Sequence, residues 1–526
     1  MGSGLVAGRG SSDLDAYART LVSRVLAVLV VAGVAAAPPP PNVAVTRSGG
    51  AVQEGGLARD PRAPAHLAIA YWDDRRGTCS LAVSSNAGAT WTSRALPALP
   101  PGASLCRNAV VAFGPDRTLY VAYEAAGLSG FAQIELARSR NGGASFGAPV
   151  LLDPDAAGGG DREPSIVAGK GGRVVVSFQH YDESEQSASV AVVSSSDRGG
   201  TFSAPVAASP AGQNAAGSRA ALALDRAGRL YVGWVDGSGV DLDAGGGTAR
   251  VVVASSRDGG RTFGRVRTVA QVPSGCGPND DCGNRYPAVS LVAPSAGHVV
   301  AAWSAGAFPD PARISFARSA GGGQRWTGRK TLAPLPRSTD RDQYGPDLAA
   351  APDGRIDLVF LDQARDADTG IVDVEHVHSL DGGNAFSRPA YLDRTAVATQ
   401  RGDVSVSASV ASSNASAAVA WSVGDVVFAA RADSAAPKPP VVRGSLVVRE
   451  GRAAVYRLSA TDAFTPTAAL RFLCGVDAAP LRPCAARLSL RLPPGPHVLR
   501  VRAVDAAGNR SAVTRLVVRS VALRAR

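Results

Sequence analysis

The chain has 526 residues, of which 45% are hydrophobic and 19% are charged. It is long enough for more than one domain with its own core, and this charge content excludes both a disordered chain and a polyelectrolyte. Its 59 Gly and 35 Pro favour short strands joined by tight turns over a helical architecture.

The N-terminal segment has the pattern of an export signal. Arg19 and Arg24 precede an apolar run over residues 25–34, and three alanines and four prolines follow at 35–41. The apolar run is short for a membrane span, so residues 1–37 are predicted to be a signal peptide. The protein is therefore expected to be secreted, extracellular or associated with the cell surface. A retained membrane anchor is the alternative.

Six similar octamers follow, starting 55 to 63 residues apart. A near-constant period of this length indicates repeated supersecondary units. The octamers are SSNAGATW from Ser84, SRNGGASF from Ser139, SSDRGGTF from Ser195, SRDGGRTF from Ser256, SAGGGQRW from Ser319 and SLDGGNAF from Ser379. Their Asp or Asn side chains are predicted to bind backbone N–H groups inside a turn, and therefore to be structural. These residues are Asn86, Asn141, Asp197, Asp258 and Asp381.

The octamers resemble the Asp-box, S-x-D-x-G-x-T-W, of sialidases and related proteins. The fifth copy departs from it at Gly321 and Arg325, and the sixth at Ala385. The resemblance implies an all-β fold, a β-propeller over residues 38–433 with four-stranded blades.

Inner strands are expected to begin near Glu54, Arg107, Arg162, Arg219, Arg285, Gln343 and Arg401, which favours seven blades. Six blades, the usual sialidase form, are the alternative. The last unit stops after its third strand, so the run Asn42–Thr46 is predicted to supply the missing outer strand and to close the ring.

A proline-rich linker is predicted over residues 434–440, followed by a second domain over 441–526. Its short strands, and the stretch GPHVLRVRAVDAAGN from Gly495, resemble bacterial immunoglobulin-like or fibronectin-like sandwiches. This domain holds 15 Arg and four acidic residues, whereas the rest of the chain has no net charge. It is expected either to dock on an anionic cell-surface polymer or simply to carry a basic surface.

The six cysteines form three pairs that are close in sequence, and an exported chain can oxidise them. The predicted disulfides join Cys79 to Cys106, Cys276 to Cys282 and Cys474 to Cys484.

A ligand of a propeller is expected at the mouth of the central channel, where the inner strands begin. Five of the predicted starts carry arginine, and these guanidinium groups would converge on one opening if the register holds. Grouped arginines need acids or an anionic ligand, and Glu163, Asp342 and Asp403 lie beside them. The predicted ligand-binding residues are Arg107, Arg162, Arg219, Arg285 and Arg401.

Arg162-Glu163-Pro164 and Arg285-Tyr286-Pro287 are similar to the Arg-Ile-Pro of sialidases. That family uses a Tyr nucleophile activated by a Glu, with an Asp as acid/base. The resemblance implies Tyr286 or Tyr344 as the nucleophile, Glu163 as its activator, and Asp73 or Asp74 as the acid. The first unit departs from the pattern, because it has Gln53-Glu54-Gly55 where the family has its first arginine.

Two functions therefore remain open. One is a binding propeller for extracellular glycans or cell-surface proteins, and the other is an exo-α-sialidase. No cofactor or metal is expected, although the acidic loops from Asp236 and Gly277 could accept calcium if they are not simply solvated. The chain has no nucleic-acid motif and is expected to be a monomer.

Overall fold

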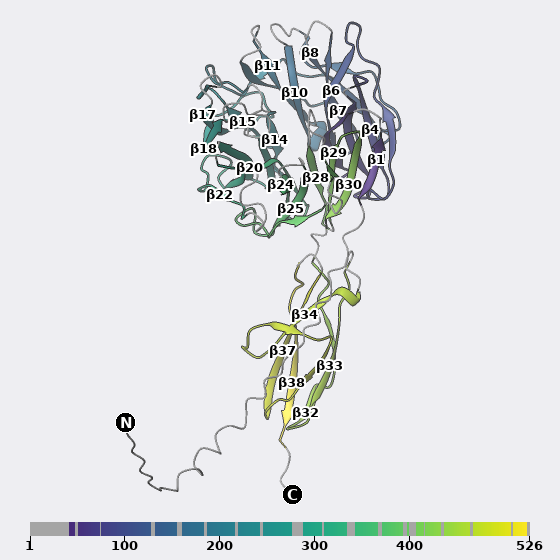
Figure 1. The fold of residues 1–526 in the computed structure, drawn as a ribbon, viewed down its shortest axis with the longest axis vertical. Helices are drawn as coiled ribbons and strands as arrows, with labels where there is room; N and C mark the ends of the chain where they lie inside the picture. The colour runs from purple at the N-terminus through teal and green to yellow at the C-terminus, as the bar shows by residue number, and fades with distance from the viewer. Residues whose placement is uncertain are drawn as a thin grey trace, which may run out of the picture.

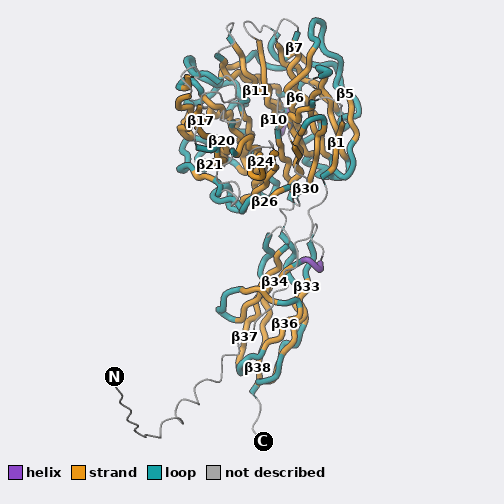
Figure 2. Tube along the Cα trace, in the orientation of Figure 1, coloured by secondary structure: helices purple, strands orange, loops and turns teal. Residues whose placement is uncertain are grey.

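The computed structural model describes residues 42–47, 51–73, 75–127, 132–154, 160–182, 187–215, 219–241, 246–275, 288–307, 310–333, 342–366, 371–392, 397–398, 407–414, 416–432, 436–462, 467–505 and 509–522. Within these ranges the protein is all-β, and its helical residues are confined to two short 3-10 turns at Lys170–Gly172 and Thr467–Ala469. A large body of strands surrounds a centre, and an elongated second body lies beside it (Figure 1, Figure 2). None of the described helices is long and apolar enough to cross a membrane.

The large body consists of successive antiparallel groups of strands, each of which starts at the centre and runs outward in chain order. The first three groups are β2 (Val52–Arg59), β3 (Leu67–Asp73), β4 (Thr78–Ser84) and β5 (Thr92–Ala95); β6 (Leu105–Phe113), β7 (Leu119–Ala126), β8 (Ala132–Ser139) and β9 (Val150–Leu151); and β10 (Gly160–Ala168), β11 (Val174–Tyr181), β12 (Ala188–Ser195) and β13 (Val206–Ala207).

The next two groups form one nine-stranded sheet, because β18 pairs with β20 in parallel over two residues. They are β14 (Ala221–Leu224), β15 (Leu230–Asp236), β16 (Val240–Asp241), β17 (Gly246–Ser256) and β18 (Arg267–Gly275); and β19 (Val289–Ser295), β20 (His298–Ala307), β21 (Arg313–Ser319) and β22 (Lys330–Thr331). The following group is β23 (Gln343–Ala350), β24 (Ile356–Asp366), β25 (Ile371–Ser379), β26 (Ala390–Tyr391) and β27 (Val397–Ala398).

The last group combines both ends of this body. Strands β28 (Ala408–Ser412), β29 (Ala417–Val423) and β30 (Val426–Ala432) are completed by β1 (Val43–Arg47), which pairs with β30. The prediction that residues 42–46 supply the outer strand of the last unit is confirmed. The inner strands contact one another in a closed order, β2, β6, β10, β14, β19, β23, β28 and again β2. The body is therefore a closed β-propeller, and β1 covers an edge that would otherwise be open.

Large apolar side chains fill the space between neighbouring groups, since both faces of each sheet pack against another sheet. Trp234, Trp303 and Trp421 are fully buried. Trp421 packs among residues of the last two groups, and Val45 of β1 packs with residues of the first and last groups. The closure is thus apolar as well as hydrogen-bonded.

All six octamers adopt the same turn. In each, the first serine accepts a hydrogen bond from the glycine N–H four residues later, at 2.8 to 3.1 Å. In the third and fourth copies, Asp197 and Asp258 accept N–H bonds from Thr201 and Thr262 at 3.0 Å. The asparagine copies keep the same bond, since Asn86 accepts the N–H of Thr90 at 2.9 Å.

The second body is a sandwich of two sheets around one core that includes Tyr456, Phe472 and Val501. One sheet has the order β31 (Val441–Arg443), β33 (Ala454–Ser459) and β36 (Arg487–Leu490); the other has β32 (Val447–Arg449), β38 (Thr514–Val521), β37 (Gly495–Val504), β34 (Arg471–Val476) and β35 (Arg482–Cys484).

Two of the predicted disulfides are confirmed, Cys79–Cys106 and Cys474–Cys484. The first links β4 to β6 and so joins two neighbouring groups of strands. The second joins β34 to β35 within the sandwich. Cys276 and Cys282 lie outside the described residues, as does the predicted signal peptide over 1–37.

Candidate functional site

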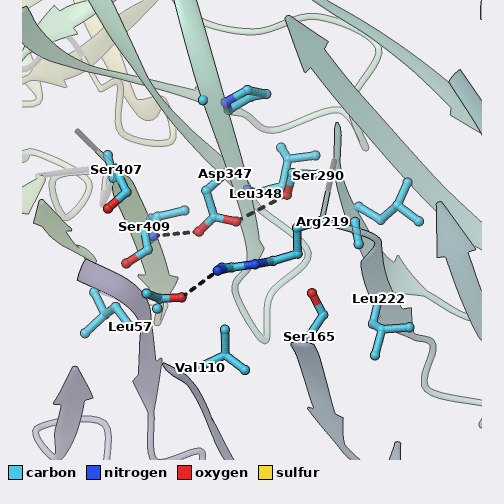
Figure 3. Close-up of a pocket in the computed structure, with 18 of the residues that line it drawn as sticks. Leu57, Val110, Ser165, Arg219, Leu222, Ser290, Asp347, Leu348, Ser407 and Ser409 are labelled. Carbon is cyan, nitrogen blue, oxygen red and sulfur yellow. Dashed lines mark hydrogen bonds between the residues drawn. The ribbon is translucent and has the colours of Figure 1, made fainter. Parts of the chain in front are cut away.

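A cavity of about 400 Å³ lies at the centre of the propeller, and every inner strand contributes to its lining (Figure 3). Representative lining residues, one from each inner strand in chain order, are Glu54, Val110, Ser165, Ala221, Ser290, Asp347 and Ser409. This volume is within the range of small-molecule sites in proteins. Segments that are more than 350 residues apart in sequence therefore share one chamber.

Bulges in the inner strands give this chamber its side chains. Four of these strands break register at the same level, between Glu54 and Gly56, Arg107 and Val110, Arg162 and Ser165, and Tyr344 and Asp347. A bulge bends the strand and redirects the side chains beside it. Two non-glycine residues in these bulges have positive φ, Asn108 at 52° and Glu163 at 53°, and such backbone strain is often found at functional sites.

Arg219 crosses this chamber just before β14. Its Nη1 donates a hydrogen bond to the carbonyl oxygen of Gly55 at 3.3 Å. The Asp347 carboxylate faces it across the cavity, as Figure 3 shows. Asp347 accepts hydrogen bonds from the Ser290 hydroxyl at 3.2 Å and from the Val410 N–H at 2.9 Å. The chamber is therefore polar, with one guanidinium held by residues from distant strands.

Glu54 is a second carboxyl group of the chamber, and its side chain is almost completely buried. The Ser409 hydroxyl donates to Glu54 Oε1 at 2.6 Å, and the Glu54 N–H donates to Ser422 at 3.1 Å. Burial raises the pKa of Glu54 to about 8, against the opposing effects of the Ser409 bond and of Arg219. Burial also raises the pKa of Asp347, to about 6. At neutral pH one carboxyl group is thus mostly protonated and the other mostly ionised.

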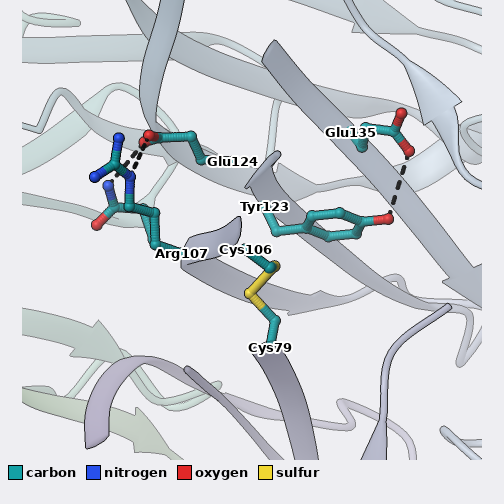
Figure 4. Close-up of a disulfide and its surroundings, with 7 residues drawn as sticks. Cys79, Cys106, Arg107, Tyr123, Glu124 and Glu135 are labelled. Carbon is teal, nitrogen blue, oxygen red and sulfur yellow. Dashed lines mark hydrogen bonds and ion pairs between the residues drawn. A yellow bond between two sulfur atoms is a disulfide. The ribbon is translucent and has the colours of Figure 1, made fainter. Parts of the chain in front are cut away.

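Three of the five predicted arginines gather around Glu163. Burial raises the pKa of Glu163, and the charges of Arg219, Arg162 and Arg107 counteract that rise. Arg107 is itself paired with Glu124, whose Oε1 is 2.6 Å from its Nε (Figure 4). Arg162 lies over the ring of Tyr181, 5.0 Å from its centroid. Arg107, Arg162 and Arg219 thus lie near Glu163, but of these three only Arg219 lines the cavity. Arg285 and Arg401 lie outside the described residues.

The residues predicted for sialidase catalysis do not assemble among the described residues. Tyr344 is buried in the apolar core between the last two groups, and burial raises its pKa. It does not line the cavity, which corrects its predicted place as an accessible nucleophile. Asp73 also lies away from the cavity, where it accepts the Arg76 N–H at 3.0 Å and holds a turn. Asp74 and Tyr286 are outside the described residues.

A Tyr–Glu contact does occur elsewhere in the propeller, between Tyr123 and Glu135. The hydroxyl of Tyr123 donates to Glu135 at 3.4 Å, beside the Cys79–Cys106 disulfide (Figure 4). Tyr123 is fully buried, and burial and the Glu135 charge raise its pKa. Because no substrate can reach a hydroxyl in this environment, this pair belongs to the core.

The loop predicted as a calcium candidate at Asp236 uses that carboxylate internally. Asp236 accepts the N–H groups of Asn214 and Ser238 and pairs with Arg250 at 2.5 Å. The second candidate loop, from Gly277, lies outside the described residues. A different group, Asp153, Asp161 and His180 at the start of β10, has the composition of a cation site.

Glu54, Asp347 and Ser409 are among the cavity residues that the sequence prediction missed. Glu54 occupies the inner-strand position that carries arginine in other units, and that alignment could have identified it. Asp347 lies four residues after the start of β23, at the bulge that brings it into the chamber, and Ser409 is the second residue of β28.

No protein-family model matches the chain, and no curated protein matches its sequence. Solved structures similar in fold include the Hadza microbial sialidase Hz136, at 13% identity and a TM-score of 0.43 over 70% of this chain and 74% of that one. An ulvan lyase of polysaccharide lyase family PL25 has 12% identity and a TM-score of 0.47, over 75% and 96% of the two chains. The α-L-arabinanase of Penicillium chrysogenum has 10% identity and a TM-score of 0.41, over 76% and 99%.

Proposed function

We propose that the protein is an exported, seven-bladed propeller that binds an acidic extracellular glycan in its central chamber. In this proposal residues 38–433 form the propeller, and residues 441–526 form an immunoglobulin-like domain after the linker 434–440. The acidic group of the sugar binds Arg219, and its hydroxyl groups bind the serine and carboxylate oxygens of neighbouring strands.

The observation that carries the proposal is the state of the groups around Arg219. Asp347 is mostly ionised at neutral pH and offsets part of the Arg219 charge, whereas Glu54, whose pKa burial raises to about 8, is mostly protonated and adds no second negative charge to the chamber. A guanidinium with planar donors suits a carboxylate or sulfate group. Ser165, Ser290, Ser407 and Ser409 supply hydroxyl groups in the same lining. Polar groups that converge in one concave site fix the orientation of a small-molecule ligand and provide specificity.

The exo-α-sialidase alternative has less support. Its nucleophile must reach the substrate, but Tyr344 is buried in the core and Tyr123 is fully buried beside a disulfide. The other predicted nucleophile, Tyr286, lies outside the described residues. A fluorogenic sialoside tests this alternative directly. The binding proposal predicts no release above a control reaction without protein.

Calorimetric titration of the full chain tests the binding proposal. The probes are sialyllactose, digalacturonate and a sulfated chondroitin disaccharide, with neutral lactose for comparison. At least one acidic probe should bind more tightly than lactose. Arg219→Ala should weaken that binding about tenfold or more, since a hydrogen bond to a charged group contributes about 1.5–3 kcal/mol.

Arg198→Ala is the matched control, because Arg198 is an exposed arginine whose Nε pairs with Asp116 at 2.8 Å, outside the cavity. It should bind the probes as the unaltered chain does. The proposal is wrong if none of the acidic probes binds at millimolar concentration, or if Arg219→Ala binds them with full affinity.

A further inference from the structure

Two carboxylates and an imidazole meet where the chain crosses from the second to the third group of strands. Asp153 follows β9, Asp161 is the second residue of β10, and His180 lies in β11 directly opposite Asp161. Gly160 makes this approach feasible. It has a φ of +86°, and a Cβ there would lie 2.5 Å from the backbone oxygen of Ala132.

The geometry of these three residues is that of ligands around one ion. One ligand atom from each lies within 4.8 Å of the other two. His180 Nδ1 and Asp161 Oδ1 are 2.8 Å apart. Asp161 is completely buried, yet its second oxygen, Oδ2, has no hydrogen-bond partner. A buried carboxylate oxygen in this state costs free energy unless a cation or donor satisfies it.

Two carboxylates share one imidazole in this group. Asp153 and Asp161 are both buried, and His180 contributes at most one positive charge. A bound cation would compensate both carboxylates.

We propose that Asp153, Asp161 and His180 bind one divalent transition-metal ion, Zn²⁺ or Mn²⁺. Two carboxylate oxygens with one imidazole nitrogen suit these ions, whereas Ca²⁺ and Mg²⁺ prefer oxygen ligands throughout. Zn²⁺ ligands of these types lie at about 2.0–2.2 Å from the metal, so two of them are at most about 4.4 Å apart. The observed limit of 4.8 Å is slightly wider than this, so binding requires a small closure of the group.

The ion would have a positioning role, because Asp161 immediately precedes Arg162 and Glu163 in β10. A metal that ties β10 to β11 and to the segment after β9 fixes the strand from which Arg162 and Glu163 project. This inference does not depend on whether the chamber binds a glycan.

The test uses the full chain after chelation and dialysis. Mn²⁺ binding is followed by the loss of the free-ion electron paramagnetic resonance signal, and Zn²⁺ binding by competition with Mn²⁺. We expect about one site per chain, a melting temperature raised by either ion, and little effect of Ca²⁺ or Mg²⁺ at the same concentration. Asp161→Asn and His180→Gln should each weaken Mn²⁺ binding at least tenfold.

His497→Gln provides a matched control. His497 Nδ1 is 2.8 Å from Asp477 Oδ2 in the sandwich, the same pairing without a second carboxylate in the group. This variant should bind Mn²⁺ as the unaltered chain does. Absence of a stoichiometric site in the unaltered chain overturns the proposal, as does full affinity in either Asp161→Asn or His180→Gln. His180 is partly exposed, so its variant decides the matter if Asp161→Asn does not fold.

Discussion

Glu54 connects the chemistry of the chamber to the stability of the fold. The folded state raises the pKa of Glu54 to about 8, whereas an unfolded chain restores it to about 4.5. Between these values the folded protein holds a proton that the unfolded chain releases, so the free energy of unfolding falls as pH rises. The slope is at most about 1.4 kcal/mol per pH unit for one group.

Glu54→Gln should remove this contribution, because the amide resembles the protonated acid and still accepts the Ser409 bond. Urea unfolding between pH 5 and pH 9 measures the effect. The variant should lose less stability than the unaltered chain as pH rises through this window. Glu450→Gln, in the sandwich, should keep the original pH dependence. Identical profiles for Glu54→Gln and the unaltered chain would refute the raised pKa.

At the residue scale, Arg219 is the one predicted arginine among the described residues that lines the cavity. Arginines at equivalent positions in successive units must converge when the units form a ring, and Arg107, Arg162 and Arg219 do so around Glu163. The sequence prediction made Tyr344 an accessible nucleophile. Its neighbours in sequence line the cavity, but side chains alternate along a strand, so the Tyr344 side chain points into the core. Asp161 and His180 are 19 residues apart, and only strand pairing brings them together.

The repeated turn is the element whose energetics can be tested most simply. Asp258 accepts hydrogen bonds from the hydroxyl groups of Ser256 and Thr262 and from the Thr262 N–H, which lowers its pKa below the usual range. Asp258→Ala removes all three bonds, and we expect it to lower the free energy of unfolding by about 1–2 kcal/mol, as loss of a capping side chain does.

Asp258→Asn should lower the free energy of unfolding much less, because asparagine serves in the first turn. There Asn86 accepts the Thr90 N–H at 2.9 Å and donates to the Thr90 hydroxyl at 2.8 Å. Asp258→Asn should also reduce the loss of stability below about pH 4, since a depressed carboxyl pKa stabilises the fold only while the group is ionised. Chemical unfolding at pH 7 and pH 3 measures both effects. Equal losses for the alanine and asparagine variants would contradict this role.

The strands and turns of the propeller were largely predictable, because the octamers and the strand-like runs around them indicate the same repeated unit. The octamers locate a turn in each of six units, and the truncated last unit indicates that residues near 42–46 complete it, as β1 does. The sandwich strands were predicted less completely. β31 and β35 have only three residues each and no alternating pattern of their own, so the sequence does not predict them individually. The pairing of β18 with β20 could not be read from either strand alone, because it joins two separate units.

At the scale of the whole molecule, the charge is divided between the two bodies. Residues 441–526 carry 15 Arg and four acidic residues, while the rest of the chain is neutral. In the sandwich, arginines such as Arg443, Arg449, Arg452 and Arg519 are exposed. The full chain should therefore be retained on immobilised heparin at low salt and released as salt screens the interaction.

Replacing Arg443, Arg449, Arg452 and Arg519 together by glutamine should lower the salt concentration needed for elution. A propeller variant with equal loss of charge, replacing Arg138, Arg198, Arg267 and Arg318, serves as the control and should elute near the original position. Equal shifts for the two variants would show that net charge alone acts, without docking by the sandwich.

The central claim is that strands from the whole ring place Arg219 in a chamber that accepts an acidic sugar. A crystal structure of the full chain with the tightest-binding acidic oligosaccharide tests it most directly. We predict sugar density in the chamber, with its carboxylate or sulfate oxygens within hydrogen-bond distance of Arg219. A sugar bound elsewhere, with the chamber unchanged, would contradict the account.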